Sequence, residues 1–315
     1  MERNSSQPTT SMFQRPLWVA IFALTAAIVW GWAYPLIKLG FVEFAITADL
    51  TGSKMLFAGI RFTLSGLIIL SLAAIGRKPF GVRRVSDWWY ILLFSLINTT
   101  LHYTFFYIGL SFAPGARSAI LNSMSVFMVV ILACIFFKSD KMNLNKVMGC
   151  VLGFTGILAL NIDALLGGSS PAADFSLMGD GMIVLNALCG ATAALLVRGL
   201  NKRVHVFVGT GYSLFVGGVL LVAASLFMGG YLPRITPLGL LYLALLIGIS
   251  SIGFALYNKL ISCNPVGKVA IYNSLIPVVG AVTSCFCLGE PFYWKYVVAG
   301  TLAAAGIYVI NKGKK

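Results

Sequence analysis

The sequence predicts an all-α fold: a polytopic membrane protein with ten transmembrane helices arranged as two inverted five-helix repeats. Composition is the first reason, because 59% of the 315 residues are hydrophobic and only 10% are charged, whereas soluble proteins carry about a quarter charged residues. The second is that the chain contains ten runs with few or no charges, most of them near the ~20 residues that cross a bilayer. The third is a segment that recurs once in the second half. Together they exclude a soluble enzyme with a membrane anchor, a secreted disulfide scaffold and a disordered chain.

The ten runs are the predicted transmembrane helices. Arg15 precedes the first run, as in a signal peptide, but that run continues through Trp30 and Trp32 and lacks a convincing small-residue cleavage site. We therefore expect it to be a retained helix. The predicted spans are 16–38, 54–76, 88–110, 115–137, 145–162, 178–200, 208–228, 238–260, 264–286 and 292–311.

The basic residues predict how these helices are oriented. If the N-terminus is cytoplasmic, 17 of the 23 Lys and Arg residues fall in cytoplasmic segments and five on the other side, with Arg61 inside a span. Cytoplasmic loops carry the excess of positive charge in membrane proteins. Both termini are therefore expected in the cytoplasm of a bacterial cell whose inner membrane holds the chain. Six of the nine acids, Asp180 and Glu290 among them, are expected in outer segments.

An internal repeat divides the chain into two halves. The stretch that begins at Ser111 aligns with the stretch that begins at Ser262, and a weaker similarity aligns Gly31 with Gly190. Each half holds five spans, and because five is odd, the second half is expected to enter the membrane from the opposite face. The identical pairs in the main match are Ser111/Ser262, Pro114/Pro265, Ala119/Ala270, Ile120/Ile271, Asn122/Asn273 and Ser123/Ser274, and Arg117/Lys268 keeps the charge.

The repeat predicts both the domain organisation and a class of function. Inverted repeats place a site between two halves that opens to each face in turn, which is the architecture of a secondary transporter. A channel or a structural membrane partner without carrier activity is the alternative. The predicted units are a cytoplasmic tail (1–15), the first repeat (16–162), a polar linker (163–177), the second repeat (178–311) and a basic tail (312–315).

Several short motifs resemble those of one known family. They are W-G-W-A-Y from Trp30, R-F-T-L from Arg61, the N-S helices after Pro114 and Pro265, L-G-E-P from Leu288, and the glycine-spaced fifth and tenth helices. With these motifs in this order, the chain resembles the EamA family of the drug/metabolite transporter superfamily over about 17–162 and 178–311. It departs from the family's usual L-G-E at the end of the fourth helix, which reads F-K-S-D here. The resemblance implies export or exchange of small metabolites, often amino acids, without ATP, and the chain has no P-loop motif.

Polar and aromatic residues in the middle of spans are the substrate-binding candidates, because polar side chains at membrane depth usually face the bundle interior or a cavity. Tyr103, Tyr107 and Asn258 are expected to line the same cavity. The candidates are Trp30, Tyr34, Asn98, His102, Asn122, Asn186, Tyr257 and Asn273.

The polar candidates each have a structural alternative. His102 lies one helical turn after Asn98 and could carry a coupling proton, or it packs and forms a hydrogen bond with a neighbouring helix. Asn122 and Asn273 either bind solute or join neighbouring helices.

The aromatic candidates on the first helix form one stripe with a cation at its outer end. Trp30, Tyr34 and Lys38 are spaced four residues apart, and aromatic walls with an outer cation suit an amphipathic zwitterion. The alternative is an interfacial aromatic belt with a snorkelling lysine, although Trp30 is too deep for that position.

Arg61 and Pro277 are the candidates for gating or charge pairing. Arg61 is expected roughly 10 Å deep at 1.5 Å per residue, where it snorkels outward or pairs with an acid or a solute carboxylate. Pro277 frees a backbone carbonyl near the middle of the ninth helix and predicts a break there. Arg117 and Lys268 are expected to anchor the helix ends or to attract anions at opposite mouths.

These observations predict a secondary transporter that moves a small organic metabolite by alternating access, with export as the expected direction. The solute is expected to be an amino acid or a related neutral, zwitterionic or aromatic compound. A membrane enzyme is disfavoured because no acid is expected inside a span, and no cofactor is expected because the six cysteines lack metal spacing. The expected partners are the solute, the lipid bilayer and a coupling proton; nucleic acid is not expected, and the protein is a monomer or homodimer.

Overall fold

In the computed structural model every regular element is a helix within the described residues, which are 12–82, 84–136, 141–160, 175–264, 269 and 271–312. The elements of the first half are η1 (Met12–Gln14), α1 (Pro16–Glu43), α2 (Thr51–Ile75), α3 (Val85–Ser95), η2 (Leu96–Leu101), α4 (His102–Phe112), α5 (Gly115–Asn122), α6 (Met124–Phe136) and α7 (Leu144–Leu160). Those of the second half are η3 (Leu177–Gly181), α9 (Met182–Asn201), α10 (Val206–Phe227), α11 (Pro237–Cys263), η4 (Ile271–Ser274), α13 (Leu275–Leu288) and α14 (Trp294–Lys312). Each predicted span coincides with a helix or a run of helical segments. Pro265, Lys268, the tails 1–11 and 313–315 and most of the predicted linker lie outside the described residues.

Seven of the described helical runs are long and apolar enough to cross a membrane, and α13 and α14 are shorter apolar helices. The chain is therefore an all-α, multi-pass membrane protein, as its composition predicts. The seven runs are Pro16–Glu43, Thr51–Ile75, Val85–Phe112, Gly115–Phe136, Leu177–Asn201, Val206–Phe227 and Pro237–Cys263.

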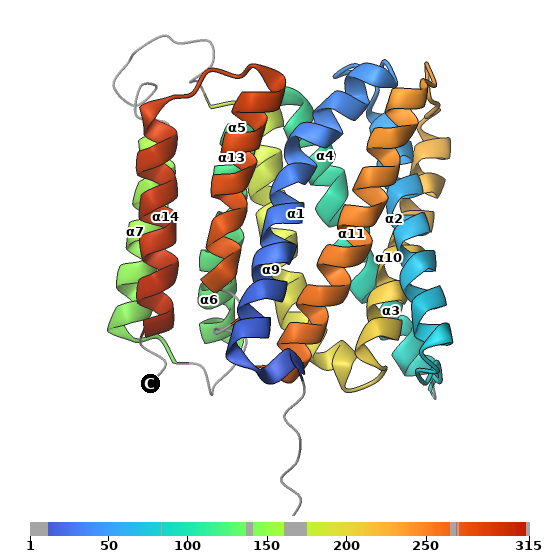
Figure 1. Cartoon of the computed structure of the whole chain (residues 1–315), viewed down its shortest axis with the longest axis horizontal. Coiled ribbons are helices and arrows are strands. Elements are labelled where there is room, and N and C mark those ends of the chain that lie inside the picture. Colours follow the sequence, from blue (N-terminus) through green and yellow to red (C-terminus); the bar gives the residue numbers. More distant parts are fainter. Residues whose placement is uncertain are drawn as a thin grey trace, which may run out of the picture.

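The helices pack as a layered bundle (Figure 1). Helices α7 and α14 pair at one side, α2, α3 and α10 form the other side, and α1 and α11 lie between them. Helix α1 begins and α14 ends at the same end of the bundle, which we call the inner end. The opposite end, where α1 ends at Glu43 and α5 begins at Gly115, is called the outer end.

Glycines bring the paired helices into backbone contact. A Cβ added to Gly66 on α2 would overlap the backbone nitrogen of Phe215 on α10. Gly149 on α7 lies against α14, and a Cβ there would be 2.6 Å from the carbonyl oxygen of Gly306. Small residues at membrane helix interfaces allow this close approach.

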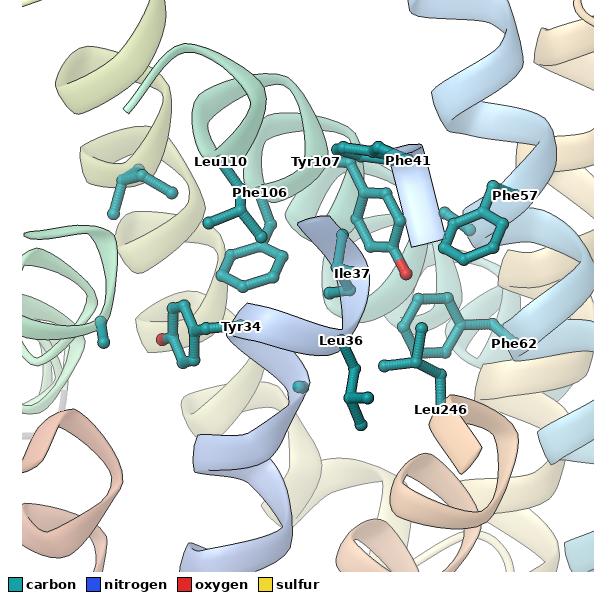
Figure 2. Packing of buried hydrophobic residues seen from close by; sticks show 14 of the residues in the cluster. Tyr34, Leu36, Ile37, Phe41, Phe57, Phe62, Phe106, Tyr107, Leu110 and Leu246 are labelled. Carbon is teal, nitrogen blue, oxygen red and sulfur yellow. The ribbon is translucent and has the colours of Figure 1, made fainter. Parts of the chain in front are cut away.

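The largest apolar cluster fixes α1 against α2, α4 and α11. Figure 2 shows Ile37 and Leu36 of α1 beside Phe62 of α2 and Leu246 of α11, while Tyr34 extends from the other side of α1. This turn of α1 therefore faces the apolar core on one side, and on the other side it faces the polar residues described below.

Among the described residues, three spans contain an irregular segment. The third contains the π-helical segment η2, the fourth breaks at Ser123 between α5 and α6, and in the ninth the 3-10 helix η4 directly precedes α13. The sequence predicts a break at Pro277, but Pro277 is buried in the first turn of α13. The first four N–H groups of a helix have no intrahelical acceptor, so proline is tolerated there, and the irregular segment lies before it.

Candidate functional site

Asn122 and Asn273 lie at the two matched interruptions. Helix α5 ends at Asn122, and η4 contains Asn273. Each side-chain amide donates a hydrogen bond to a tyrosine from another helix: Asn122 Nδ2 to Tyr34 Oη (2.9 Å), and Asn273 Nδ2 to Tyr257 Oη (2.7 Å). Irregular backbone at membrane depth is tolerated where it is buried in protein or lines a cavity, so both asparagines lie at positions suited to a site.

Asn186 extends the first of these contacts across the two halves of the chain. Its Nδ2 donates to Asn122 Oδ1 at 2.7 Å, so that Tyr34, Asn122 and Asn186 link α1, α5 and α9. The side chain of Asn186 is fully buried, and its Oδ1 has no hydrogen-bond partner in the structure. A buried acceptor without a donor is unfavourable by about 1–3 kcal/mol.

Trp30 packs against α11. Its ring makes edge-to-face contacts with Phe254 (5.4 Å between centroids) and Tyr257 (5.2 Å). Gly253 makes room for the indole, because a Cβ there would lie 2.5 Å from Trp30 Nε1. Trp30 and Tyr257 are each half-buried, and they stand beside the Asn273 interruption.

His102 is the first residue of α4, directly after η2. Its imidazole lies edge-to-face with Tyr103 at 4.7 Å and packs over Gly190 of α9, where a Cβ would be 2.9 Å from His102 Cε1. The Nδ1 atom is buried without a hydrogen-bond partner, although the side chain as a whole is half-buried.

Whereas His102 packs against α9, Asn98, which lies within η2, contacts α10. Its Nδ2 donates to Ser213 Oγ on α10 at 3.1 Å, and Asn258 likewise donates to Thr210 Oγ1 on α10 at 2.8 Å. These two asparagines join helices.

Arg61 is buried in the outer half of the bundle and does not snorkel. Only 2% of its surface is exposed. Its Nε donates to Ser250 Oγ (2.8 Å) and a terminal N–H donates to Tyr107 Oη (3.0 Å). Arg61 therefore holds α2, α4 and α11 together through neutral partners, and Tyr107, which is fully buried, belongs to this contact and to the apolar core.

A second polar region joins the two halves at the outer end. Lys38 Nζ of α1 lies 3.1 Å from Glu290 Oε1, which follows α13. The same carboxylate accepts hydrogen bonds from the backbone N–H groups of Gly115 (2.8 Å) and Ala116 (3.0 Å) at the start of α5. Gly289 has φ +63°, a left-handed conformation that glycine adopts readily after a helix, and it turns Glu290 towards α5.

Asp180 lies inside a span and not in an outer segment, which corrects the prediction. It belongs to η3 and is 1% exposed. Its carboxylate accepts two hydrogen bonds from the Arg117 guanidinium, at 2.8 and 2.7 Å. Asp180 is the third residue of the predicted span 178–200, and this position is the signal in the sequence that the acid lies within the span. Arg117 accordingly forms a buried ion pair at the start of α5.

The inner end also carries contacts between the halves. Arg203 Nε lies 3.2 Å from Asp87 Oδ1, and Asn264 Nδ2 donates to the Phe13 carbonyl at 2.7 Å. His205 precedes α10, and partial burial together with the positive charges of Lys78 and Lys259 lowers the pKa of its imidazole.

The centre of the bundle thus presents half-buried side chains that are uncharged or aromatic. Such a surface can form hydrogen bonds and ring contacts with a solute. Across the described ranges, His, Cys, Asp and Glu form no group of three or more that could hold a metal ion. The half-buried residues of this central cluster are Trp30, His102, Tyr103, Asn122, Tyr257 and Asn273.

The sequence of this chain matches one known protein family over most of its length. The EamA-like transporter family matches residues 17–162 and 177–312. An uncharacterized transporter of Bacillus subtilis (strain 168), YvbV, is 26% identical over 94% of this chain and 92% of its own. A probable amino-acid metabolite efflux pump of Salmonella typhimurium is 24% identical over 91% and 92% of the two chains, and one of Escherichia coli (strain K12) is 22% identical over 92% and 93%. A solved crystal structure covers 92% of this chain and 95% of its own with a TM-score of 0.64 at 16% identity, which shows a shared fold.

Proposed function

Because the chain belongs to the EamA-like transporter family, we propose that it carries a small organic metabolite across the bacterial inner membrane by alternating access. The proposed solute is an amino acid or a related neutral, zwitterionic or aromatic compound. The proposed direction is export, with both termini in the cytoplasm. The names of the Salmonella and Escherichia relatives support the amino-acid class and the direction, and the 17-to-5 distribution of basic residues supports the orientation.

One observation carries this proposal: the helix interruptions occur at the same Asn-Ser pair in both halves. Asn122 is the last residue of the short helix α5, and Asn273 lies within the short helix η4. The side chain of each donates a hydrogen bond to a tyrosine from another helix. In secondary transporters, discontinuous helices at corresponding positions of two repeats mark the substrate site. We therefore place the solute in the central cluster.

The pairing of helices supports an inverted repeat. In an inverted repeat, α1 corresponds to α9, α4 to α11 and the α5–α6 span to α13. The α1–α11 contact then corresponds to the α9–α4 contact, and the α1–α13 contact to the α9–α6 contact. The pairs α2–α10, α7–α14 and α5–α13 each map onto themselves. These relations are expected for a two-fold axis in the membrane plane.

The outer ion pairs support a closed outer end in this conformation. Lys38–Glu290 and Arg117–Asp180 both join the first half to the second. Opening the outer end would require these contacts to separate, so they are the proposed outer gate.

Counterflow in proteoliposomes tests the carrier function. Vesicles loaded with a labelled amino-acid mixture should lose label faster when unlabelled amino acids are added outside, and the rate should saturate. Leakage that ignores the outside solute and does not saturate would favour a channel, and no flux at all with intact insertion would favour a structural membrane partner.

A further inference from the structure

We propose that Lys38 and the start of α5 form a carboxylate-binding site, which Glu290 occupies while the outer end is closed and a solute carboxylate occupies when it opens. This inference rests on the proposed carrier function and narrows its solute to compounds that bear a carboxylate.

The donors of this site converge on one carboxylate position. Glu290 Oε1 accepts from Gly115 N at 2.8 Å and lies 3.1 Å from Lys38 Nζ, while Oε2 accepts from Ala116 N at 3.0 Å. Two backbone N–H groups at a helix start, together with an ammonium group, favour an anion through hydrogen bonds and through the helix dipole. Any carboxylate with access could make the same three contacts.

The site is open enough to admit a small solute. A pocket of about 290 Å³ adjoins the Glu290 carboxylate. Its walls contain the ammonium group of Lys38, the carboxylate of Glu290 and several aromatic rings. They are formed by Lys38, Ser111, Phe112, Ala113, Pro114, Glu290, Pro291, Tyr293 and Tyr296.

Two buried hydroxyl groups beside α5 indicate that this region has unused binding capacity. Ser284 of α13 packs directly on Gly115, where a Cβ would lie 2.6 Å from Ser284 Oγ. Ser284 and Ser118 are both fully buried, and neither hydroxyl has a hydrogen-bond partner in the structure. Such groups are unfavourable unless a partner satisfies them in another state.

One of these hydroxyl groups, that of Ser118, lies between the outer site and the central cluster. Gly115, Ser118 and Asn122 are spaced i, i+3 and i+7, which places them on one face of α5. Asn122 is already joined to Tyr34 and Asn186. A carboxylate leaving the centre would thus meet hydroxyl and then backbone donors along one helix face.

Glu290 then has two roles that a structural acid would not have. It holds the outer end closed by bridging α1 and α5, and it competes with solute for the same donors. A solute that displaces Glu290 releases the bridge, so binding and opening are coupled through one exchange of carboxylates.

Chemical rescue tests the site without knowledge of the solute. Purified Glu290→Ala protein should unfold at a lower temperature than the native chain, and sodium acetate should restore much of the loss in a saturable way. Sodium chloride at equal ionic strength and acetamide should not. Glu43→Ala is the matched control, because it removes another outer-end carboxylate, which accepts from Thr236 Oγ1 at 2.6 Å and does not cap α5; acetate should leave it unchanged. An absent acetate effect in Glu290→Ala, or an equal effect in Glu43→Ala, overturns the site.

Counterflow tests the solute class and remains usable if Glu290→Ala does not fold. In the native protein, amino acids should accelerate exchange from outside, and their methyl esters and amides should not. In Lys38→Gln, the outside half-saturation concentration should rise about tenfold, as expected for losing one charge-assisted contact, with less than a twofold change from inside. Exchange that treats acids, esters and amides alike overturns the carboxylate proposal and leaves the carrier function intact. If no amino acid exchanges at all while acetate still rescues Glu290→Ala, the assignment of amino acids as the solute fails and the outer site stands.

Discussion

Asn122 joins three helices through two hydrogen bonds, whereas its repeat-related counterpart Asn273 joins two segments through one. Replacing each with leucine therefore should have unequal effects. Asn122→Leu leaves Tyr34 and Asn186 without their shared partner and should lower the free energy of unfolding by about 1–3 kcal/mol. Asn273→Leu should lower it by about 1 kcal/mol or less. Chemical denaturation in detergent micelles measures both, and a larger loss in Asn273→Leu would contradict the assigned contacts.

Arg117 and Asp180 form a buried pair whose partners depend on each other. Removing the cation by Arg117→Leu leaves the Asp180 carboxylate buried without its guanidinium partner, which should destabilise the protein by about 3–5 kcal/mol. The double variant Arg117→Leu with Asp180→Leu should be more stable than Arg117→Leu alone, because the buried carboxylate is removed together with its partner. Additive losses in a double-mutant cycle would show that the two residues act separately.

At the residue level, the sequence identified side chains better than it identified their partners. Membrane depth was enough to single out Asn122, Asn186 and Trp30, because polar and large aromatic groups there need a protein environment. Their partners come from other helices and depend on helix rotation. The same holds for Asp180: its position within the predicted span 178–200 indicates burial, but nothing in the sequence indicates that a cation from another helix reaches it.

At the scale of helices, the spans themselves were predictable. Charge-free runs placed α2, α10 and α11 within a few residues of their ends, because the bilayer thickness sets their length. Local irregularities were not. In the π-helical turn η2, the hydroxyl groups of Thr99 and Thr100 donate hydrogen bonds to backbone carbonyls of α10 at 3.1 Å. The sequence pattern of Leu96–Leu101 does not indicate that these acceptors from another helix are present. The repeated Asn-Ser pair was visible, but its association with helix interruption required the structure.

The α2–α10 pair provides a prediction about packing. A methyl group at Gly66 would overlap the backbone of α10, so Gly66→Ala should force the helices apart and lower thermal stability. Gly248→Ala on α11 is the control, because a Cβ there meets no atom within 4 Å; it should be neutral or raise stability by up to about 1 kcal/mol through helix propensity. If Gly66→Ala is as stable as Gly248→Ala, the two helices are not in backbone contact in the membrane.

At the scale of the molecule, the proposed carrier consists of two five-helix halves that meet at a central uncharged site and a charged outer end. The sequence predicted ten spans and a repeat in opposite orientation, since both follow from counting and self-alignment. Which of the helices pair could not be predicted, because apolar helix faces in a bilayer are nearly interchangeable and small residues decide the contacts. The acids Asp180 and Glu290 show the consequence: both are visible in the sequence, but their assignment to the proposed outer gate depends on how the two halves are arranged.

Alternating access is the central claim, and paired distance measurements test it most directly. Spin labels would replace the exposed residues Phe112 and Phe292 at the outer end, and in a second protein Phe136 and Ser262 at the inner end, after substitution of the six native cysteines. In nanodiscs, Glu290→Gln, which weakens the outer bridge, should shift the outer pair to longer distances and the inner pair to shorter ones. If both distances move in the same direction, or neither moves while counterflow persists, transport does not proceed by alternating closure of the two ends.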